Sequence, residues 1–297
     1  MRRILEFSSE LGGSVTARAA GWLAAVALTA GGCGPTAVGP GDDGDDTGDD
    51  DGDDTGDDGG DDTGPPPAPT AVVYAHSSDA LYSIDPDTLA VRRIGAFDWP
   101  GGDDEMTDLA VDRDGGIIGI SFDSVYAVDP ATAAATRLAA LDGGFTGLTY
   151  VPVGVLDDAA EVLVAADESG GLYRVDPATG DATAIGSYGE FGSSGDLVSV
   201  DGFGTVATVI DLDREGEDIL ARVDFALDGR ATPVADQPTG IDDLFGLGFW
   251  GGTVFGFAAG GEIVTLDVTT GRATVIDTGG VAWAGAGVTT AAPIVIE

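Results

Sequence analysis

One short phrase returns five times along this chain at a nearly constant interval. It reads LYSIDP at residues 81–86, VYAVDP at 125–130 and LYRVDP at 172–177, with weaker copies LARVD at 220–224 and IVTLD at 263–267. The aspartates that the copies share are 43 to 48 residues apart. A period of about 45 residues that holds four short strands is typical of a β-propeller, in which each repeat forms one blade.

The residues between two copies of the phrase divide into four strands and their turns. In the second repeat we expect an inner strand at 106–111, a second strand at 117–121, a third at 125–128 and an outer strand at 136–140. The shared aspartate opens the turn between the third and outer strands, where it can accept backbone N–H bonds while a following proline presets φ. We therefore expect a structural role, neither catalytic nor metal-binding, for Asp85, Asp129, Asp176, Asp224 and Asp267.

The two ends of the repeat region predict how the ring closes. Only one strand, at 71–75, precedes the first copy of the phrase, whereas a surplus strand at 283–288 follows the last one. If the surplus strand becomes the inner strand of blade one, five complete blades result and no sheet edge stays exposed. The predicted fold is all-β: a five-bladed β-propeller of four-stranded antiparallel blades over residues 70–297, closed by the C-terminal strand.

The repeat also carries a family resemblance. The phrase Leu-Tyr-x-Val-Asp-Pro-x-Thr-Gly at 172–180, the TAIG that ends at Gly186 and the inner-strand TGLTY at 146–150 resemble the repeats of bacterial extracytoplasmic propellers of the YVTN, NHL and quinoprotein-like group. The resemblance covers residues 70–297. Because that group includes binding scaffolds, surface proteins and some enzymes, it implies a fold and no single activity.

Residues 1–34 resemble a bacterial lipoprotein signal. Arginines at positions 2, 3 and 18 accompany an apolar run, 19–30, that is too short to span a bilayer but suits a signal peptide. The LTAGGC that ends at Cys33 resembles a lipobox, although Ala30 stands where leucine is usual. We predict that Cys33 is lipidated and attaches the protein to a membrane on the extracytoplasmic side of the cell envelope, the outer membrane or cell surface included. The alternatives are a buried amphipathic helix and an inert, buried thiol.

Residues 35–69 are predicted to form a disordered tether. From position 41 to 64 the segment consists of Asp, Gly and Thr, and PPPAP closes it. Without apolar side chains nothing offsets the entropy of ordering, and the like charges keep the chain extended. The tract resembles Asp-rich calcium repeats, but it lacks the glutamate at the twelfth position that an EF-hand loop needs, so we expect only weak, non-specific Ca²⁺ association.

The charge of the chain argues against polyanionic partners. Twelve arginines and no lysines face 52 acids, which gives a formal net charge of −40. Nucleic-acid binding depends on basic patches, so we exclude nucleic acid as a partner. Direct adhesion to anionic lipid is excluded for the same reason, and a membrane contact would depend on the N-terminal lipid.

The candidate site lies where the inner strands begin at the central channel. Alignment of these strands places Asp108, Gly147, Asp196, Gly246 and Gly285 at one equivalent position. The carboxylates of Asp108 and Asp196 either bond free backbone amides at the channel mouth, or hold a cation such as Ca²⁺, or share a proton. Asp243 is a third candidate for holding a cation or ligand at the channel mouth. No other cofactor or metal is expected.

Aromatic residues on the loops between blades are the second candidate set. The loops that join each outer strand to the next inner strand combine aromatic and acidic residues, which suits recognition of a sugar or a protein partner. Capping of the core between blades is the alternative. The candidates are Trp99, Phe145, Tyr188, Phe191 and Trp283. His76 has no second histidine or cysteine near it in the domain, so we expect an ordinary surface or strand-end residue.

Two functions are compatible with these features. The first is a non-enzymatic, lipid-anchored scaffold of the cell envelope that binds a protein or a polysaccharide. The alternative is a carbohydrate-active enzyme, a glycosidase or a lyase, that uses the channel carboxylates Asp108 and Asp196 together with Asp243. No arginine occurs in the inner strands and no Gly-x-Ser-x-Gly nucleophile motif is present, so the scaffold is the favoured hypothesis.

Overall fold

The computed structural model describes residues 72–213 and 217–295. All of them belong to the compact unit Ala68–Glu297, which follows a separate unit, Met1–Pro67. The predicted signal segment, the lipidation of Cys33 and the predicted tether at 35–69 lie outside the described residues. Within the described ranges, no helix has both the length and the apolar character needed to cross a membrane.

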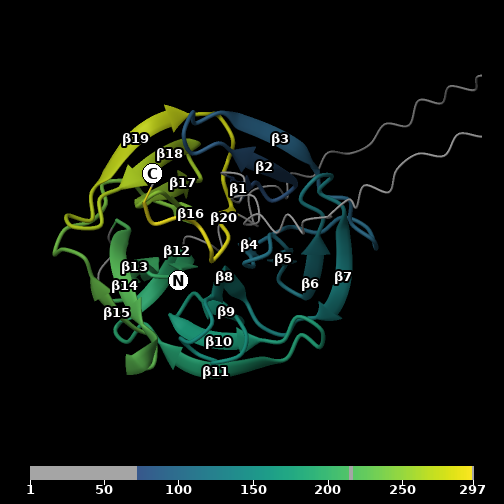
Figure 1. Cartoon of the computed structure of the whole chain (residues 1–297), viewed down its shortest axis with the longest axis horizontal. Coiled ribbons are helices and arrows are strands. Elements are labelled where there is room, and N and C mark those ends of the chain that lie inside the picture. The colour runs from purple at the N-terminus through teal and green to yellow at the C-terminus, as the bar shows by residue number, and fades with distance from the viewer. Residues whose placement is uncertain (1–71, 214–216, 296–297) are drawn as a thin grey trace, which may run out of the picture. The chain divides into compact units, whose positions relative to one another are not determined.

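The described residues form five antiparallel sheets of four strands, which stand around a common axis (Figure 1). This arrangement confirms the predicted five-bladed β-propeller. The blades, each written from its inner to its outer strand, are β20 (Gly285–Gly287), β1 (Val73–His76), β2 (Ala80–Ile84) and β3 (Val91–Ala96); β4 (Asp108–Val111), β5 (Ile117–Ile120), β6 (Ser124–Val128) and β7 (Ala135–Ala140); β8 (Phe145–Val151), β9 (Val162–Asp167), β10 (Gly171–Val175) and β11 (Ala182–Ser187); β12 (Phe191–Val200), β13 (Gly204–Asp211), β14 (Ile219–Asp224) and β15 (Arg230–Pro233); and β16 (Leu244–Trp250), β17 (Thr253–Ala258), β18 (Glu262–Leu266) and β19 (Ala273–Thr278).

The C-terminal strand completes the N-terminal blade, as the sequence predicted. Strand β20 pairs antiparallel with β1, so that Tyr74 lies opposite Gly287 and His76 lies opposite Gly285. The pairing covers the edge that β1 would otherwise expose to solvent. Blade one is therefore built from the two ends of the propeller sequence.

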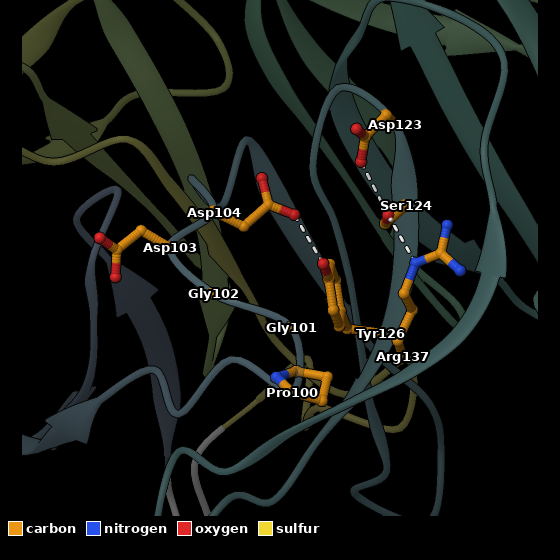
Figure 2. Close-up of a pocket in the computed structure, with 9 residues that line it drawn as sticks. All are labelled: Pro100, Gly101, Gly102, Asp103, Asp104, Asp123, Ser124, Tyr126 and Arg137. Carbon is orange, nitrogen blue, oxygen red and sulfur yellow. Dashed lines mark hydrogen bonds between the residues drawn. The ribbon is translucent and has the colours of Figure 1, made fainter.

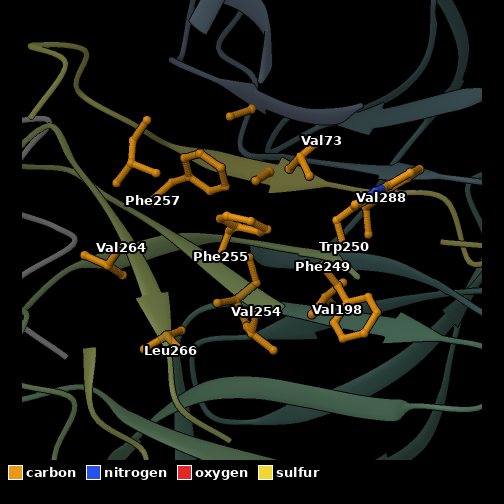
Figure 3. Close-up of a cluster of buried hydrophobic side chains, with 14 of the residues drawn as sticks. Val73, Val198, Phe249, Trp250, Val254, Phe255, Phe257, Val264, Leu266 and Val288 are labelled. Atoms are coloured by element: carbon orange, nitrogen blue, oxygen red, sulfur yellow. The ribbon is translucent and has the colours of Figure 1, made fainter. Parts of the chain in front are cut away.

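Buried apolar side chains fill the spaces between and within the blades. The largest cluster joins blade five to blade one, where Val73, Phe249, Phe255 and Phe257 pack together (Figure 3). Full burial of each such side chain stabilises the fold by about 1.5–3 kcal/mol. Because this cluster includes the first described strand, the same packing that forms a core also holds the ring shut.

The repeated aspartates have the structural role that the sequence predicted. Each accepts a hydrogen bond from the backbone N–H two residues further on, and three of them also accept the N–H of the residue after that. The acceptors are Asp85, Asp129, Asp176, Asp224 and Asp267. These bonds close the turns that leave the third strand of every blade.

The ring has two distinct faces. We call the end at which the inner strands begin the upper face, and the other end the lower face. Because β1 runs antiparallel to β20, it starts at the lower face and brings His76 to the upper one. The described part of the chain thus begins on the lower face, opposite the loops that carry the predicted site residues.

The segment that follows β20 binds the lower ends of four blades. Thr289 pairs with Val111 of blade two, and the Thr290 hydroxyl donates to Glu161 of blade three. The carbonyl of Thr290 accepts the N–H of Asp201 in blade four at 2.9 Å. The carbonyl of Pro293 accepts the N–H of Gly251 in blade five at 2.8 Å. Residues 289–293 therefore cross the lower mouth of the ring and tie the blades together there.

Candidate functional site

Asp108 links blades two and three at the upper end of the axis. Its Oδ1 accepts the N–H of Leu109 at 2.8 Å, and its Oδ2 accepts the N–H of Leu148 at 2.6 Å. Leu148 belongs to β8, the inner strand of the next blade. The side chain has no exposed surface. It therefore acts as a bridge between two inner strands that cannot hydrogen-bond to each other as a sheet.

Asp196 makes the same bridge between blades four and five. Its Oδ1 accepts the N–H of Leu197 at 2.5 Å and its Oδ2 accepts the N–H of Leu247 at 2.6 Å. It too is completely buried. Amide bonding, one of the three possibilities that the sequence left open, accounts for these contacts.

Glycine occupies the equivalent position of the other three inner strands because the backbones crowd together. A Cβ on Gly147 would lie 2.9 Å from the carbonyl oxygen of Gly195, and a Cβ on Gly246 would lie 2.7 Å from the carbonyl carbon of Gly285. Real Cβ atoms do not approach other atoms so closely. Junctions bridged by a carboxylate, between blades two and three and between blades four and five, therefore alternate with junctions where two inner backbones touch, between blades three and four and between blades five and one.

The inner strand of blade one, β20, is different because a histidine fills the space beside its glycine, Gly285. His76, at the end of β1, is fully buried, and its Nε2 lies 3.6 Å from Oδ1 of Asp108. A Cβ on Gly285 would collide with both groups. The expected strand-end position of His76 is confirmed, but the expected surface position is wrong, because ring closure sets the end of β1 at the channel mouth.

The charge state of His76 follows from its surroundings. Burial lowers the pKa of His76 to about 4, so the imidazole is neutral near pH 7. The neutral ring can donate from Nδ1 to the carbonyl of Ser77, 2.9 Å away. In this tautomer Nε2 has no hydrogen on it and no hydrogen-bond partner among the described residues.

The two axial carboxylates are both fully buried, and the charge of Asp196 adds to burial in raising the pKa of Asp108. Burial raises the pKa of Asp108 well above its usual range and raises the pKa of Asp196 to about 8. The buried Tyr188 lies close enough that both carboxylates, after burial itself, raise the pKa of its hydroxyl. The axis is thus a closed, polar region that holds acids and no charged base.

This arrangement limits the chemistry that the axis can perform. All four carboxylate oxygens accept backbone N–H groups, whereas Ca²⁺ requires six to eight oxygen ligands. No group of three His, Cys, Asp or Glu side chains with metal-binding geometry occurs among residues 72–213 and 217–295. The contacts favour the amide-bonding interpretation over a cation. Neither Asp108 nor Asp196 is exposed, so a polysaccharide at the surface has no axial carboxylate to contact.

Asp243 does not join the axial pair. It is exposed, has a positive φ of 55°, and directly precedes β16, where its carbonyl accepts the N–H of Ala259 at 3.0 Å. A buried acid that the sequence gave no reason to nominate, Asp218, lies nearby and accepts the N–H of Leu244 at 2.6 Å. Burial raises the pKa of Asp218 to about 7.

The predicted recognition aromatics separate into two groups. Phe145, Tyr188 and Trp283 are 3%, 0% and 1% exposed, which is the core-capping alternative that the sequence left open. Trp283 packs edge-on against both Tyr82 and Phe257. Trp99 and Phe191 are partly exposed. Only these last two can meet a partner at the surface.

A pocket of about 390 Å³ lies on the upper side of blade two, next to Trp99 (Figure 2). Its ring packs against Tyr126 at 5.0 Å between centroids. Tyr126 donates to Asp104 at 2.6 Å, and Nε of Arg137 donates to Ser124 at 2.9 Å. The lining residues are Pro100, Gly101, Gly102, Asp103, Asp104, Asp123, Ser124, Tyr126 and Arg137. The pocket therefore presents acidic and basic groups, of which Asp104 and Arg137 are held by hydrogen bonds to Tyr126 and Ser124.

Comparison with known proteins adds little beyond the fold. No protein-family model and no curated protein matches the chain. Among solved structures, a symmetrical protein of de novo evolutionary emergence is 17% identical, with a TM-score of 0.46 over 75% of this chain and 99% of its own. Virginiamycin B lyase from Staphylococcus aureus is 14% identical, with a TM-score of 0.41 over 71% of this chain and 67% of its own. Hydrazine synthase from Kuenenia stuttgartiensis is 14% identical, with a TM-score of 0.38 over 69% of this chain and 62% of its own.

The chain is thus a five-bladed β-propeller with a buried pair of carboxylates at its axis. The varied neighbours carry no argument about activity at this level of identity. The resemblance to extracytoplasmic propellers is supported as far as the propeller fold.

Proposed function

We propose that this protein is a lipid-anchored, extracytoplasmic propeller that binds a neutral, hydroxyl-rich polysaccharide of the cell envelope at the pocket beside Trp99. The observation that carries the proposal is the placement of this pocket. It lies at the upper side of the ring on loops that are exposed, whereas β1, the first described strand, starts at the lower face.

The composition of the pocket supports a polyhydroxylated ligand. Hydroxyl groups both donate and accept, so they match a lining in which Asp103 offers acceptors and the terminal nitrogens of Arg137 offer donors. The partly exposed Trp99, which packs against the lining residue Tyr126, adds an apolar surface beside the pocket. A polyanion is disfavoured because three aspartates face one arginine in the pocket and the chain carries a net charge of −40.

The binding proposal is tested with the full chain on an array of neutral and charged polysaccharides, scored for both binding and hydrolysis. We expect salt-insensitive binding to neutral polymers that Arg137→Ala and Trp99→Ala weaken at least tenfold. Arg93→Ala, an exposed arginine on β3, is the matched control and should bind normally. Binding only to a basic peptide, and only at low salt, would replace the polysaccharide with a cationic protein partner. Hydrolysis without detectable scaffold binding would favour the enzyme.

The anchoring proposal needs a separate test. Cells that express the wild-type chain or the Cys33→Ser chain are fed labelled palmitate, and the protein is then isolated. We expect label on the wild type alone, together with loss of residues 1–32. Equal labelling of the two chains would disprove lipidation at this cysteine without bearing on the pocket.

A further inference from the structure

We propose that one buried water molecule is bound between His76 and Asp108, and that it joins blades one and two at the upper end of the axis. His76 ends β1 of blade one, and Asp108 begins β4 of blade two. The imidazole Nε2 and the carboxylate Oδ1 are 3.6 Å apart, and neither side chain has any exposed surface. A direct hydrogen bond is shorter than this, whereas one water oxygen can bond to two atoms at such a separation.

The junction between blades one and two lacks the connection that the other four junctions have at this end. Those four are made by the bridging carboxylates or by inner backbones that touch. The inner strands β20 and β4 come together further down, where a Cβ on Gly287 would lie 2.9 Å from the carbonyl oxygen of Leu109. At the upper end, His76 and Asp108 face each other without a direct hydrogen bond. A bridging water would complete the ring there.

The hydrogen-bonding capacity of the two groups matches water. Nδ1 of His76 faces the carbonyl of Ser77 at 2.9 Å, and a carbonyl only accepts, so Nδ1 carries the ring hydrogen and Nε2 of the neutral ring needs a donor. Oδ1 of Asp108 already accepts the N–H of Leu109 at 2.8 Å and can form one more bond. Water donates to Nε2 with one O–H. With its second bond it donates to a carboxylate or accepts from a carboxylic acid, so the site does not depend on the charge of Asp108.

Other occupants fit this position less well than water does. A metal ion would find only one nitrogen and one oxygen, and no group of three metal-ligating side chains occurs in the described ranges. No side chain comes between the two atoms from the neighbouring strand, because position 285 is glycine and a Cβ there would collide with both. Globular proteins hold about one buried water per 27 residues, bonded to buried polar groups that the protein itself leaves unpaired.

The upper end of the ring has further buried polar atoms of this kind. The Tyr188 hydroxyl and Nε1 of Trp283 are buried without a hydrogen-bond partner in the part of the chain that the structure describes. Both residues lie on loops that lead to inner strands, at the same end as His76. Because buried polar groups in folded proteins are almost always bonded, this end of the axis is where internal water is expected.

The test is nuclear magnetic resonance of the full chain with an isotope-labelled histidine ring. His76 is the only histidine of the chain, so its ring signals are unambiguous. The hydrogen on Cδ2 is the probe, because Cδ2 is bonded to Nε2 and not to Nδ1. We expect the nitrogen signals to show a hydrogen on Nδ1 and none on Nε2. We also expect a cross-peak between the Cδ2 hydrogen and water, with the sign of a long-lived complex.

Ser77→Ala is the matched control. It removes the hydroxyl next to His76, through which exchange with solvent could imitate bound water, and it keeps the carbonyl that Nδ1 bonds. The cross-peak should persist in this variant, and its loss would assign the signal to the hydroxyl and overturn the proposal. A hydrogen on Nε2, which would mean a direct ionic contact with Asp108, or a wild type without the cross-peak would also overturn it.

Crystals of the wild type and of His76→Phe provide an independent measurement. The wild type should show a water oxygen within hydrogen-bond distance of both Nε2 and Oδ1 of Asp108, and His76→Phe, which keeps a ring but has no Nε2, should lose it. Wild-type density without a water at this position would contradict the proposal. If His76→Phe does not fold, the spectra of the wild type and Ser77→Ala decide the question alone.

Discussion

Two sets of aspartates in this propeller both accept hydrogen bonds from backbone N–H groups, and yet their pKa values are shifted in opposite directions. At the lower-face turns, Asp85 and Asp129 each accept two backbone N–H bonds, and these bonds lower the pKa of both carboxyls. At the axis, Asp108 and Asp196 also accept two such bonds each, but burial raises the pKa of both.

The difference shows that desolvation, not the number of hydrogen bonds, decides the sign. The turn aspartates are open to water, so their charged form keeps most of its hydration and gains the amide bonds in addition. The axial aspartates lose that hydration, and the amides restore only part of it. Bonds from backbone amides can therefore accompany a lowered pKa at the rim of the ring and a raised pKa at its centre.

The largest loss of stability is expected from the deletion of residues 281–297, which disturbs the axis and leaves the turn aspartates in place. This change removes β20 and the segment across the lower mouth, and it exposes an edge of β1 and of the blades beside it. We expect a loss of several kcal/mol, enough to unfold a domain of ordinary stability, which is about 5–15 kcal/mol. Thermal unfolding followed by circular dichroism measures the effect. Deletion of 296–297 alone is the control, and a 281–297 deletion that melts like the full chain would contradict the closure.

Next in size is the contrast between Asp196→Ala and Asp176→Ala. The first leaves the amides of Leu197 and Leu247 buried without an acceptor, at about 1–3 kcal/mol for each. The second exposes its turn amide to water, which replaces the lost bond, so the change should be much smaller. Urea unfolding at pH 6 compares the two chains. Equal losses of stability would mean that removing a hydrogen-bond acceptor at the axis costs no more than removing one at a surface turn.

Gly285→Ala should destabilise the fold by about 1–3 kcal/mol. The new Cβ collides with His76 and Asp108, and neither side chain can move away because both are enclosed. Gly144→Ala is the matched control, since a Cβ at that position meets nothing within 4 Å. Urea midpoints of the two variants at one pH provide the measurement, and similar midpoints would indicate that the axis has free space.

The smallest expected effect sharpens the comparison at acid pH. The lowered pKa of Asp129 means that its contribution is present above about pH 4 and is lost as the pH falls toward the folded value. Asp129→Asn should therefore flatten the acid limb of the stability profile slightly and leave the profile above about pH 6 intact. Acid titration of the unfolding midpoint measures both. A change above pH 6 would show that the rim and the axis are coupled.

Much of the fold could be predicted from the sequence because its signals are local. The turn aspartates bond to amides two or three residues away, so the LYxVDP phrase specifies the turn by itself. Repetition of that phrase gave the number of blades, and the unequal ends of the repeat gave the pairing of β20 with β1. Alignment of the inner strands also found Asp108 and Asp196, although it left their role open.

Only the tertiary structure decided what those side chains meet. Asp108 and Leu148 are 40 residues apart, Asp196 and Leu247 are 51 apart, and His76 reaches Asp108 only because β20 returns beside β1. The burial of Phe145, Tyr188 and Trp283, and of Asp218, likewise depends on how neighbouring blades pack. The sequence by itself determined the repeat, the turns and the closure, because those follow from short-range bonds and strand pairing. The protonation and burial of the axis were decided by the closed ring, because desolvation depends on every blade that surrounds a group.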